Sequence, residues 1–251
     1  SPEFTADQYL TGERFSFYSP SAQAIVAPDA MPVATEDDHQ LSLRLATTRN
    51  GIEYGLYGYQ GFWTTPVGFK FDQHNIGAAY FPRLNAYGAS LRMPALSGLV
   101  NTELAVYNSV EDADGTNPFV ANGQIRFLLG YERELITNVT GAAQFYLEHT
   151  KNYEAFIANA KSSHTQVDET RQLLTVRLTH LARQQTLINS LFLAYSPTDS
   201  DAYIKPSTTF KYSDQWHMSA GANVFVGKHI HTFFGQHQDN SNVWFRTKYI
   251  F

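Results

Sequence analysis

The stretch that decides the fold is Val243-Trp244-Phe245-Arg246-Thr247-Lys248-Tyr249-Ile250-Phe251, at the end of the 251-residue sequence. Counted in twos, one side carries Val243, Phe245, Thr247, Tyr249 and Phe251, and the other side carries Trp244, Arg246, Lys248 and Ile250. Because side chains alternate along a strand, this pattern predicts a β-strand with one mostly apolar and one partly charged face. A soluble protein gains nothing from such a strand here. A bacterial outer-membrane barrel needs it, since closing the sheet leaves no backbone edge in lipid.

The composition suits a barrel wall and contains no candidate membrane helix. The chain has a net charge of −5, no cysteine, 15 Tyr and 18 Phe, and its mean hydropathy is −0.31. No stretch approaches the ~18 consecutive apolar residues of a membrane helix. Barrel strands alternate apolar and polar residues, so they average out as mildly hydrophilic. The mild acidity along the chain argues against nucleic acid as a partner, and the lack of cysteine agrees with an oxidising periplasmic route.

Segments with a period of two recur along the chain, and each is near the ten residues that a tilted membrane strand needs. They predict eleven strands, at residues 41–46, 52–57, 87–93, 100–106, 124–132, 143–148, 174–179, 187–193, 204–212, 217–226 and 243–251. Asn50-Gly51, between the first two, is the strongest short hairpin signal. A further strand near Glu13–Ser19 would bring the count to about twelve.

The predicted connections alternate between short and long, which is typical of outer-membrane barrels with periplasmic turns and external loops. The short ones fall at 49–51, 94–98, 134–139, 181–185 and 213–215, and the longer ones at 61–79, 109–121, 150–170, 196–201 and 227–240. We expect one barrel domain over residues 1–251, with residues 1–37 supplying a first strand and an external loop, and residues 38–251 supplying the other strands. Asn152–Ser162 is predicted to form a short helix that acts as a plug or lid.

A soluble β-sandwich or a lipocalin-like barrel is the main alternative fold, with its apolar face pointing inward. The polar faces argue against it, because they contain many Gly, Ser, Thr and Tyr residues and few Lys/Glu pairs. Soluble sheets also seldom sustain strands of ten residues so uniformly. The pattern therefore favours an all-β, transmembrane, antiparallel up-and-down barrel.

If the apolar faces meet lipid, the alternate residues line a lumen whose charges are unevenly distributed. Acidic residues come from the earlier strands and basic residues from the later ones, and such opposed walls create a field across a wet pore. The predicted lining comprises Arg171, Arg177, Lys205, Lys211, Arg246 and Lys248 with Glu103, Glu132 and Glu148 opposite, and Glu53 lies on the acidic side as well. Arg44 and Arg126 interrupt the segregation, so the same charges could instead form ion pairs that stiffen the barrel.

Other clusters suggest metal or catalytic chemistry only in outline. His229, His231 and His237 lie close together, but only Asp239 is near enough to add a carboxylate. Asp112-Ala113-Asp114-Gly115-Thr116-Asn117 is as rich in oxygen ligands as a calcium loop but lacks the full spacing. We therefore predict no metal and no cofactor.

Two hydrolase patterns were also considered. His217 and Ser219 share one face of a strand, as the base and nucleophile of outer-membrane phospholipases do, but Ala220-Gly221 follows the serine where those enzymes have Asn-Gly. Asp37 with His39, or Asp112 with Asp114, could sit at an external rim in the manner of an outer-membrane protease. The residues around them do not match that class, and we predict no catalytic residue.

Several motifs together resemble a family of large Gram-negative outer-membrane barrels, mostly uncharacterised and related in style to alginate-export porins. The motifs are Gln8-Tyr9-Leu10-Thr11-Gly12-Glu13-Arg14, Tyr57-Gly58-Tyr59, Gly61-Phe62-Trp63, Tyr87-Gly88-Ala89-Ser90-Leu91-Arg92, Gly130-Tyr131-Glu132-Arg133-Glu134, Ser196-Pro197 with Asp199, Asp201-Ala202-Tyr203, Gly221-Ala222-Asn223-Val224-Phe225, Thr232-Phe233-Phe234-Gly235-Gln236 and Asp239-Asn240-Ser241-Asn242-Val243. The resemblance implies that this is the C-terminal portion of a barrel of 14–18 strands. The terminal Phe251 with Tyr249 also resembles the signal read by the outer-membrane insertion machinery.

The sequence thus predicts an outer-membrane channel or exporter for passive passage of small polar or anionic solutes. Its expected partners are outer-membrane lipid and lipopolysaccharide, the barrel-insertion machinery and the solute. One alternative is a non-conducting barrel scaffold that docks or sheathes a periplasmic or extracellular protein. A lesser alternative is an outer-membrane hydrolase.

Overall fold

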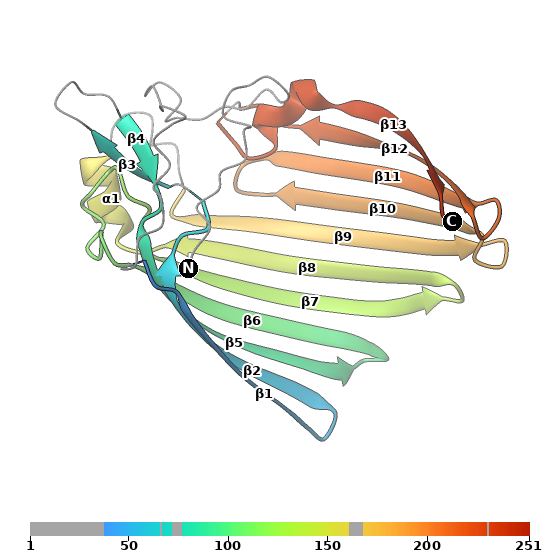
Figure 1. Cartoon of the computed structure of the whole chain (residues 1–251), viewed down its shortest axis with the longest axis horizontal. Coiled ribbons are helices and arrows are strands. Elements are labelled where there is room, and N and C mark those ends of the chain that lie inside the picture. The colour runs from blue at the N-terminus through green and yellow to red at the C-terminus, as the bar shows by residue number, and fades with distance from the viewer. Residues whose placement is uncertain (1–37, 66, 72–76, 161–167, 230) are drawn as a thin grey trace.

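The computed structural model describes residues 38–65, 67–71, 77–160, 168–229 and 231–251, and its main feature is one antiparallel sheet (Figure 1). Eleven strands follow one another in up-and-down order. They are β1 (Leu41–Arg49), β2 (Ile52–Phe62), β5 (Arg83–Ala95), β6 (Gly98–Ser109), β7 (Gln124–Ile136), β8 (Val139–Thr150), β9 (Thr170–Ala182), β10 (Leu187–Ser196), β11 (Asp201–Lys211), β12 (Trp216–Val226) and β13 (Asn242–Tyr249). All eleven strands predicted from the period of two are confirmed. The strand predicted near Glu13–Ser19, with the rest of residues 1–37, lies outside the described residues.

The connections also follow the predicted alternation: short turns gather at one end of the sheet and longer connections at the other (Figure 1). We call these the turn end and the loop end. At the turn end, Asn50 and Gly51 have φ of 53° and 75°, the left-handed pair that a two-residue hairpin turn requires. At the loop end, the predicted helix is confirmed as α1 (Tyr153–Asn159), and the last connection contains the 3₁₀ helix η2 (Gly235–Asn240).

One element was not predicted. The connection between β2 and β5 contains a separate two-stranded sheet, β3 (Gly68–Phe71) paired with β4 (Gly77–Tyr80). The sequence predicts only a long external loop here, because strands of four residues are too short to show a period. The β3–β4 hairpin lies at the loop end, above the main sheet (Figure 1).

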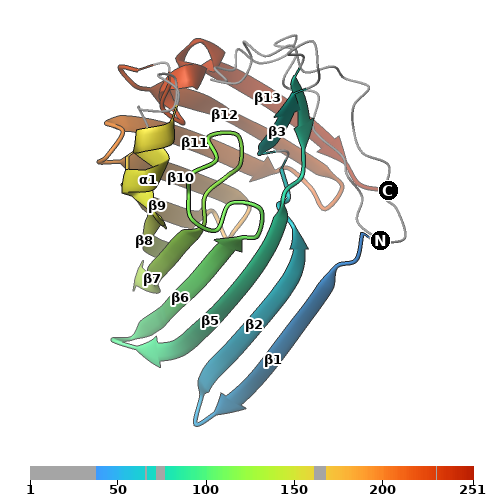
Figure 2. The same cartoon turned by 90° about the vertical axis from the view of Figure 1, so that its left-hand side faces the viewer.

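The main sheet is curved and open. Figure 2 shows the strands following an arc from β1 to β13, with the β6–β7 connection and α1 inside the arc. Within the described residues, β1 pairs only with β2 and β13 pairs only with β12, so the sheet does not close on itself. A closed barrel therefore stays a prediction.

The strand register places the apolar positions of all eleven strands on one continuous face. Directly opposed residues on this face include Leu45 with Leu56, Leu104 with Phe127 and Phe145 with Leu174. The leucines of these pairs are exposed, with fractions of 59% for Leu56 and 49% for Leu104, and the two phenylalanines are half-buried. Soluble sheets cover such a face with a second layer, and the described residues supply none.

The buried core lies instead at the loop end, and its sheet residues include Leu84 and Ala194 on the polar face. Its apolar members are Phe62, Trp63, Phe81, Leu84, Val120, Ala194 and Phe234. The ring of Trp63 stacks on that of Tyr107 with centroids 5.7 Å apart, and the Phe69 N–H donates to the carbonyl of Phe119 at 2.8 Å. The long connections therefore fold inward and pack on the sheet.

Substitution of Gly51 tests the hairpin turn between β1 and β2. A Cβ at Gly51 would meet nothing within 4 Å, but the φ of 75° is unfavourable for any side chain, so Gly51→Ala should lower the free energy of unfolding by about 1 kcal/mol. Gly58→Ala is the matched control, since that site in β2 is equally open and its φ is not positive. Denaturant unfolding in detergent micelles would measure both. Equal effects of the two substitutions would contradict the turn geometry.

Candidate functional site

The candidate functional site is the polar face of the sheet. The register places every charged residue of the predicted lining on this face, opposite the apolar one. The residues are Glu53, Glu103, Glu132 and Glu148 on β2 and β6–β8, and Arg171, Arg177, Lys205, Lys211, Arg246 and Lys248 on β9, β11 and β13. Their role as a pore lining stays a prediction, but their common face follows directly from the pairing.

A polar hollow of about 600 Å³ lies on this face toward the turn end of β1, β2, β5, β6 and β7. Its charged lining residues are Arg44, Glu53, Arg92, Glu103 and Glu132. Glu53 lies directly opposite Arg92 in the register. The acidic side is therefore interleaved with arginines, which confirms the interruption seen in the sequence and adds Arg92 to it.

Glu148 is tied into a network near the loop end of β7 and β8. Its Oε2 lies 3.2 Å from Nε of Arg126 and accepts the Tyr146 hydroxyl at 2.8 Å. The Arg126 guanidinium also sits 4.3 Å above the centre of the Tyr107 ring. This glutamate is thus paired within the protein, as the ion-pair alternative expected for the predicted lining.

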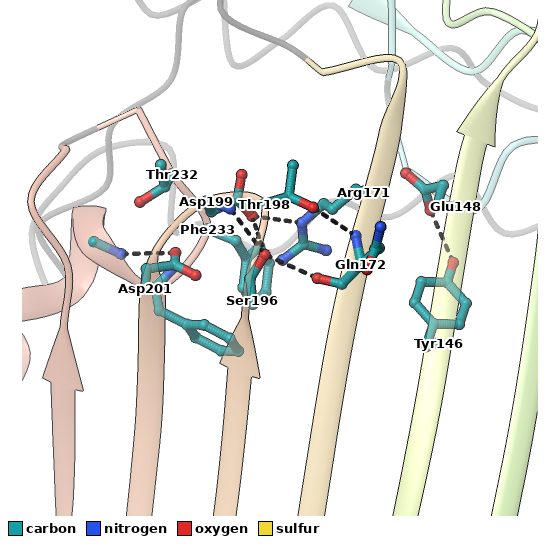
Figure 3. Close-up of polar contacts among 12 residues, drawn as sticks. Tyr146, Glu148, Arg171, Gln172, Ser196, Thr198, Asp199, Asp201, Thr232 and Phe233 are labelled. Atoms are coloured by element: carbon teal, nitrogen blue, oxygen red, sulfur yellow. Dashed lines mark hydrogen bonds and ion pairs between the residues drawn. The ribbon is translucent and has the colours of Figure 1, made fainter.

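Arg171 is likewise paired, to an aspartate that the sequence analysis did not select. Its Nε lies 2.8 Å from Oδ2 of Asp199, in the turn between β10 and β11 (Figure 3). The buried Ser196 hydroxyl oxygen is 2.9 Å from both that Oδ2 and the carbonyl oxygen of Gln172. Thr198 accepts the N–H of Gln172 at 3.0 Å. The β10–β11 turn is therefore bound to β9.

Asp201 holds the last long connection onto the polar face, and it too was missed. Only 1% of the residue is exposed, and its Oδ2 accepts the N–H groups of Phe234 at 2.6 Å and Gly235 at 3.2 Å. The Phe234 ring stacks on that of Tyr203 with centroids 6.1 Å apart. We call these contacts the Asp201 latch. The sequence contains one ambiguous signal for this latch. It is an aspartate at the start of a strand, on the polar face, together with a Phe-Phe-Gly sequence that precedes β13.

The other predicted basic residues have no such partners. Within the described part of the chain, no carboxylate lies within 4.0 Å of Arg177, Lys205, Lys211, Arg246 or Lys248. Lys211 lies opposite His217, and His217 lies opposite Lys248, so three basic side chains form one row across β11–β13 at the turn end. We call Arg177, Lys205, Lys211, Arg246 and Lys248 the basic wall. They give the later strands a net positive polar face.

The remaining candidates find little support as catalytic or metal sites. Ser219 is buried and its hydroxyl is 2.9 Å from that of Thr209, with no hydrogen bond to His217 among the described residues. The rings of His229 and His231 stack 5.3 Å apart, yet the described residues hold no group of three His, Asp or Glu suited to a metal. Asp37 lies outside the described residues.

The residues of the predicted insertion signal lie at the turn end of β13. The Tyr249 ring packs 4.9 Å from that of Trp216 and 5.8 Å from that of Phe251, which is itself fully exposed. In the described chain, no helix combines the length and apolarity that crossing a membrane requires. Comparison with protein-family models finds no match, and comparison with curated proteins finds none of significance. The resemblance to alginate-export-like barrels therefore stays a prediction.

Removal of the Asp201 carboxylate tests the latch. Asp201→Ala leaves two N–H groups without their acceptor, so opening of the β12–β13 connection should become easier by about 1–3 kcal/mol. Limited trypsin digestion should then cut after the exposed Lys228 about tenfold faster or more. Asp214→Ala, in the exposed β11–β12 turn, is the control and should cut at the wild-type rate. An unchanged rate in Asp201→Ala would contradict the latch.

Proposed function

We propose that the sheet is the wall of a bacterial outer-membrane β-barrel that acts as a passive channel for small polar or anionic solutes. The observation that carries this proposal is the continuous apolar face, which exposes large hydrophobic side chains on nine of the eleven strands, with the predicted lining charges on the opposite face. Lipid outside and water inside is the environment that such a two-faced sheet fits.

The position of the core favours this proposal over a soluble sandwich or lipocalin-like barrel. A soluble fold would bury the apolar face and leave the polar face in water. Here the inward-folded connections pack on the polar face, while Leu43 and Phe245 on the apolar face are 60% and 69% exposed. An apolar surface of that extent is typical of contact with a membrane or another protein.

The strand directions support a barrel with further strands. β1 and β13 both run from the loop end to the turn end, so direct pairing between them would be parallel. A barrel whose neighbours are all antiparallel has an even number of strands, and eleven is odd. Closure therefore requires an odd number of additional strands, which agrees with the predicted total of twelve as well as with a larger even barrel.

The mechanism we propose needs no cofactor and no catalytic residue. Solute diffuses down its gradient through the water-filled lumen, and the basic wall raises the local concentration of anions. Arg171 and Glu148 contribute less to selectivity, because their charges are neutralised by Asp199 and Arg126. Lipid, lipopolysaccharide and the barrel-insertion machinery are the partners that the outer surface would meet.

One observation favours a second candidate, the non-conducting scaffold that docks a periplasmic or extracellular protein. The β3–β4 hairpin, the β6–β7 connection and η2 all fold over the polar face at the loop end (Figure 2). Such coverage would narrow the loop-end opening of the proposed barrel, and a fully plugged barrel would carry little ionic current.

The lipid-facing assignment is tested by two neighbouring substitutions on β10. Leu191→Arg places a charge on the apolar face, opposite Leu178 and Pro206, and should cost about 2–4 kcal/mol of folding free energy in a bilayer. Ser190→Arg places the same charge on the polar face, opposite Thr179 and Ser207, and should fold normally. Folding into lipid vesicles, followed by urea titration, would measure both. Equal tolerance would exclude the membrane orientation.

The channel itself is tested in a planar bilayer under a salt gradient. Stable conductance steps with an anion-biased reversal potential are expected, and Arg177→Glu should shift that potential toward cations. Arg49→Glu, the same charge reversal at the edge of the apolar face, should leave it unchanged. Clean insertion without conductance would exclude the channel and favour the scaffold.

A further inference from the structure

The β6–β7 connection, residues 110–123, contains a buried carboxylate that lacks a partner. Only 3% of Asp112 is exposed, and its Oδ1 accepts the N–H of Asn117 at 3.0 Å. Its Oδ2 has no hydrogen-bond partner among the described residues. Oδ2 is itself buried, although it belongs to the same carboxyl group as the hydrogen-bonded Oδ1. A buried carboxylate oxygen without a donor is costly.

A second carboxylate lies beside the first. Burial raises the pKa of Asp112, and the neighbouring Asp114 carboxylate raises it further, against the lowering effect of the Asn117 and Thr116 N–H groups. No basic side chain of the described chain lies within 4.0 Å of either acid. The nearby Lys151 is directed elsewhere, with Nζ donating to Asn108 at 2.8 Å. The described chain thus places no positively charged side chain beside these two carboxylates.

A third unpartnered oxygen comes from the other end of the same connection. Asn122 is 6% exposed, its Nδ2 donates to the Lys151 carbonyl at 3.2 Å, and its Oδ1 is buried without a partner. This amide packs against the acidic loop, since a Cβ at Gly115 would lie 2.7 Å from Asn122 Nδ2. The buried hydroxyl of Ser109, three residues before Asp112, is unpartnered as well.

We propose that the β6–β7 connection binds a calcium ion through the carboxylates of Asp112 and Asp114 and the amide oxygen of Asn122. Calcium accepts carboxylate, amide and hydroxyl oxygens in irregular geometry, whereas magnesium demands a near-ideal octahedron. The proposed site contains two carboxylates rather than three acidic or histidine ligands. Neutral oxygens would supply the remaining ligands of the ion. Residues 110–123 contain no histidine or cysteine, the ligands that zinc prefers.

The ion would brace the loop end of the sheet. Asn152, next to α1, donates from Nδ2 to the carbonyl of Ala113 at 2.9 Å, and Phe119 links the connection to β3. A cation at Asp112 would therefore hold together three segments that fold over the polar face. This inference does not depend on conduction through the sheet.

Calorimetric titration of the full chain in detergent micelles with CaCl2 tests the site. Dissociation constants of extracellular calcium sites are on the order of 10⁻⁴–10⁻³ M, so about 10 mM should saturate it. We expect one ion per chain and, at about ten times the dissociation constant, a rise in Tm of about 3 °C. Asp112→Asn should abolish both effects, and Asp214→Asn in the β11–β12 turn should retain them.

A second readout separates binding from misfolding. In EDTA at neutral pH, Asp112→Asn should be at least as stable as wild type, because it removes a buried carboxylate while keeping the shape. Calcium should then make wild type the more stable of the two. The proposal would be overturned if CaCl2 gave no heat of binding, if Asp112→Asn bound calcium equally well, or if MgCl2 produced an equal response. Bilayer conductance is not involved, so failure of the channel proposal would leave this result unaffected.

Discussion

The structure depends on one constraint: ten successive antiparallel pairings keep the two-residue period of every strand in phase. A shift of one residue in any pairing would move that strand's apolar side chains to the polar face. The register holds from β1 to β13, with one irregularity between Glu134 and Ile136 at the turn end of β7. The tight turns help to maintain it, since Asn50 and Gly51 allow only one alignment of β1 with β2. The two-faced sheet, and every proposal about its surroundings, follows from this phase.

The loop end supplies the three-dimensional packing that the sheet alone lacks. A single curved sheet has no second layer, so burial at the loop end depends on connections such as residues 110–123 and 227–241 that pack on the strands. Two carboxylates organise this region: Asp199 receives Arg171, and Asp201 receives two backbone N–H groups. Hydrogen bonds to a charged acceptor are stronger than neutral ones, which suits a place where a connection must be held against open water.

The charges of the polar face divide according to their partners. Toward β7–β9 they are neutralised within the protein, as in the Arg126–Glu148 and Arg171–Asp199 pairs. On β11–β13, Lys211 and Lys248 lie on either side of His217 in the register, and no carboxylate of the described chain lies within 4.0 Å of either lysine. A mobile anion would neutralise these lysines, whereas the paired charges gain nothing from one. In the proposed channel, selectivity and rigidity would thus depend on different parts of the same face.

The sequence by itself determined the eleven strands, their two faces, the alternation of short and long connections and the helix at α1. These are local features, and a period of two or a turn pair such as Asn50-Gly51 can be read from neighbouring residues. The tertiary structure alone decided which charges are paired, where the core lies and which oxygens lack partners. The β3–β4 hairpin is too short to show a period. The Asp201 latch joins residues 33 and 34 apart in the chain, and Asn122 reaches Gly115 across a folded connection. Such contacts depend on how connections fold onto the sheet, and no periodic pattern encodes that.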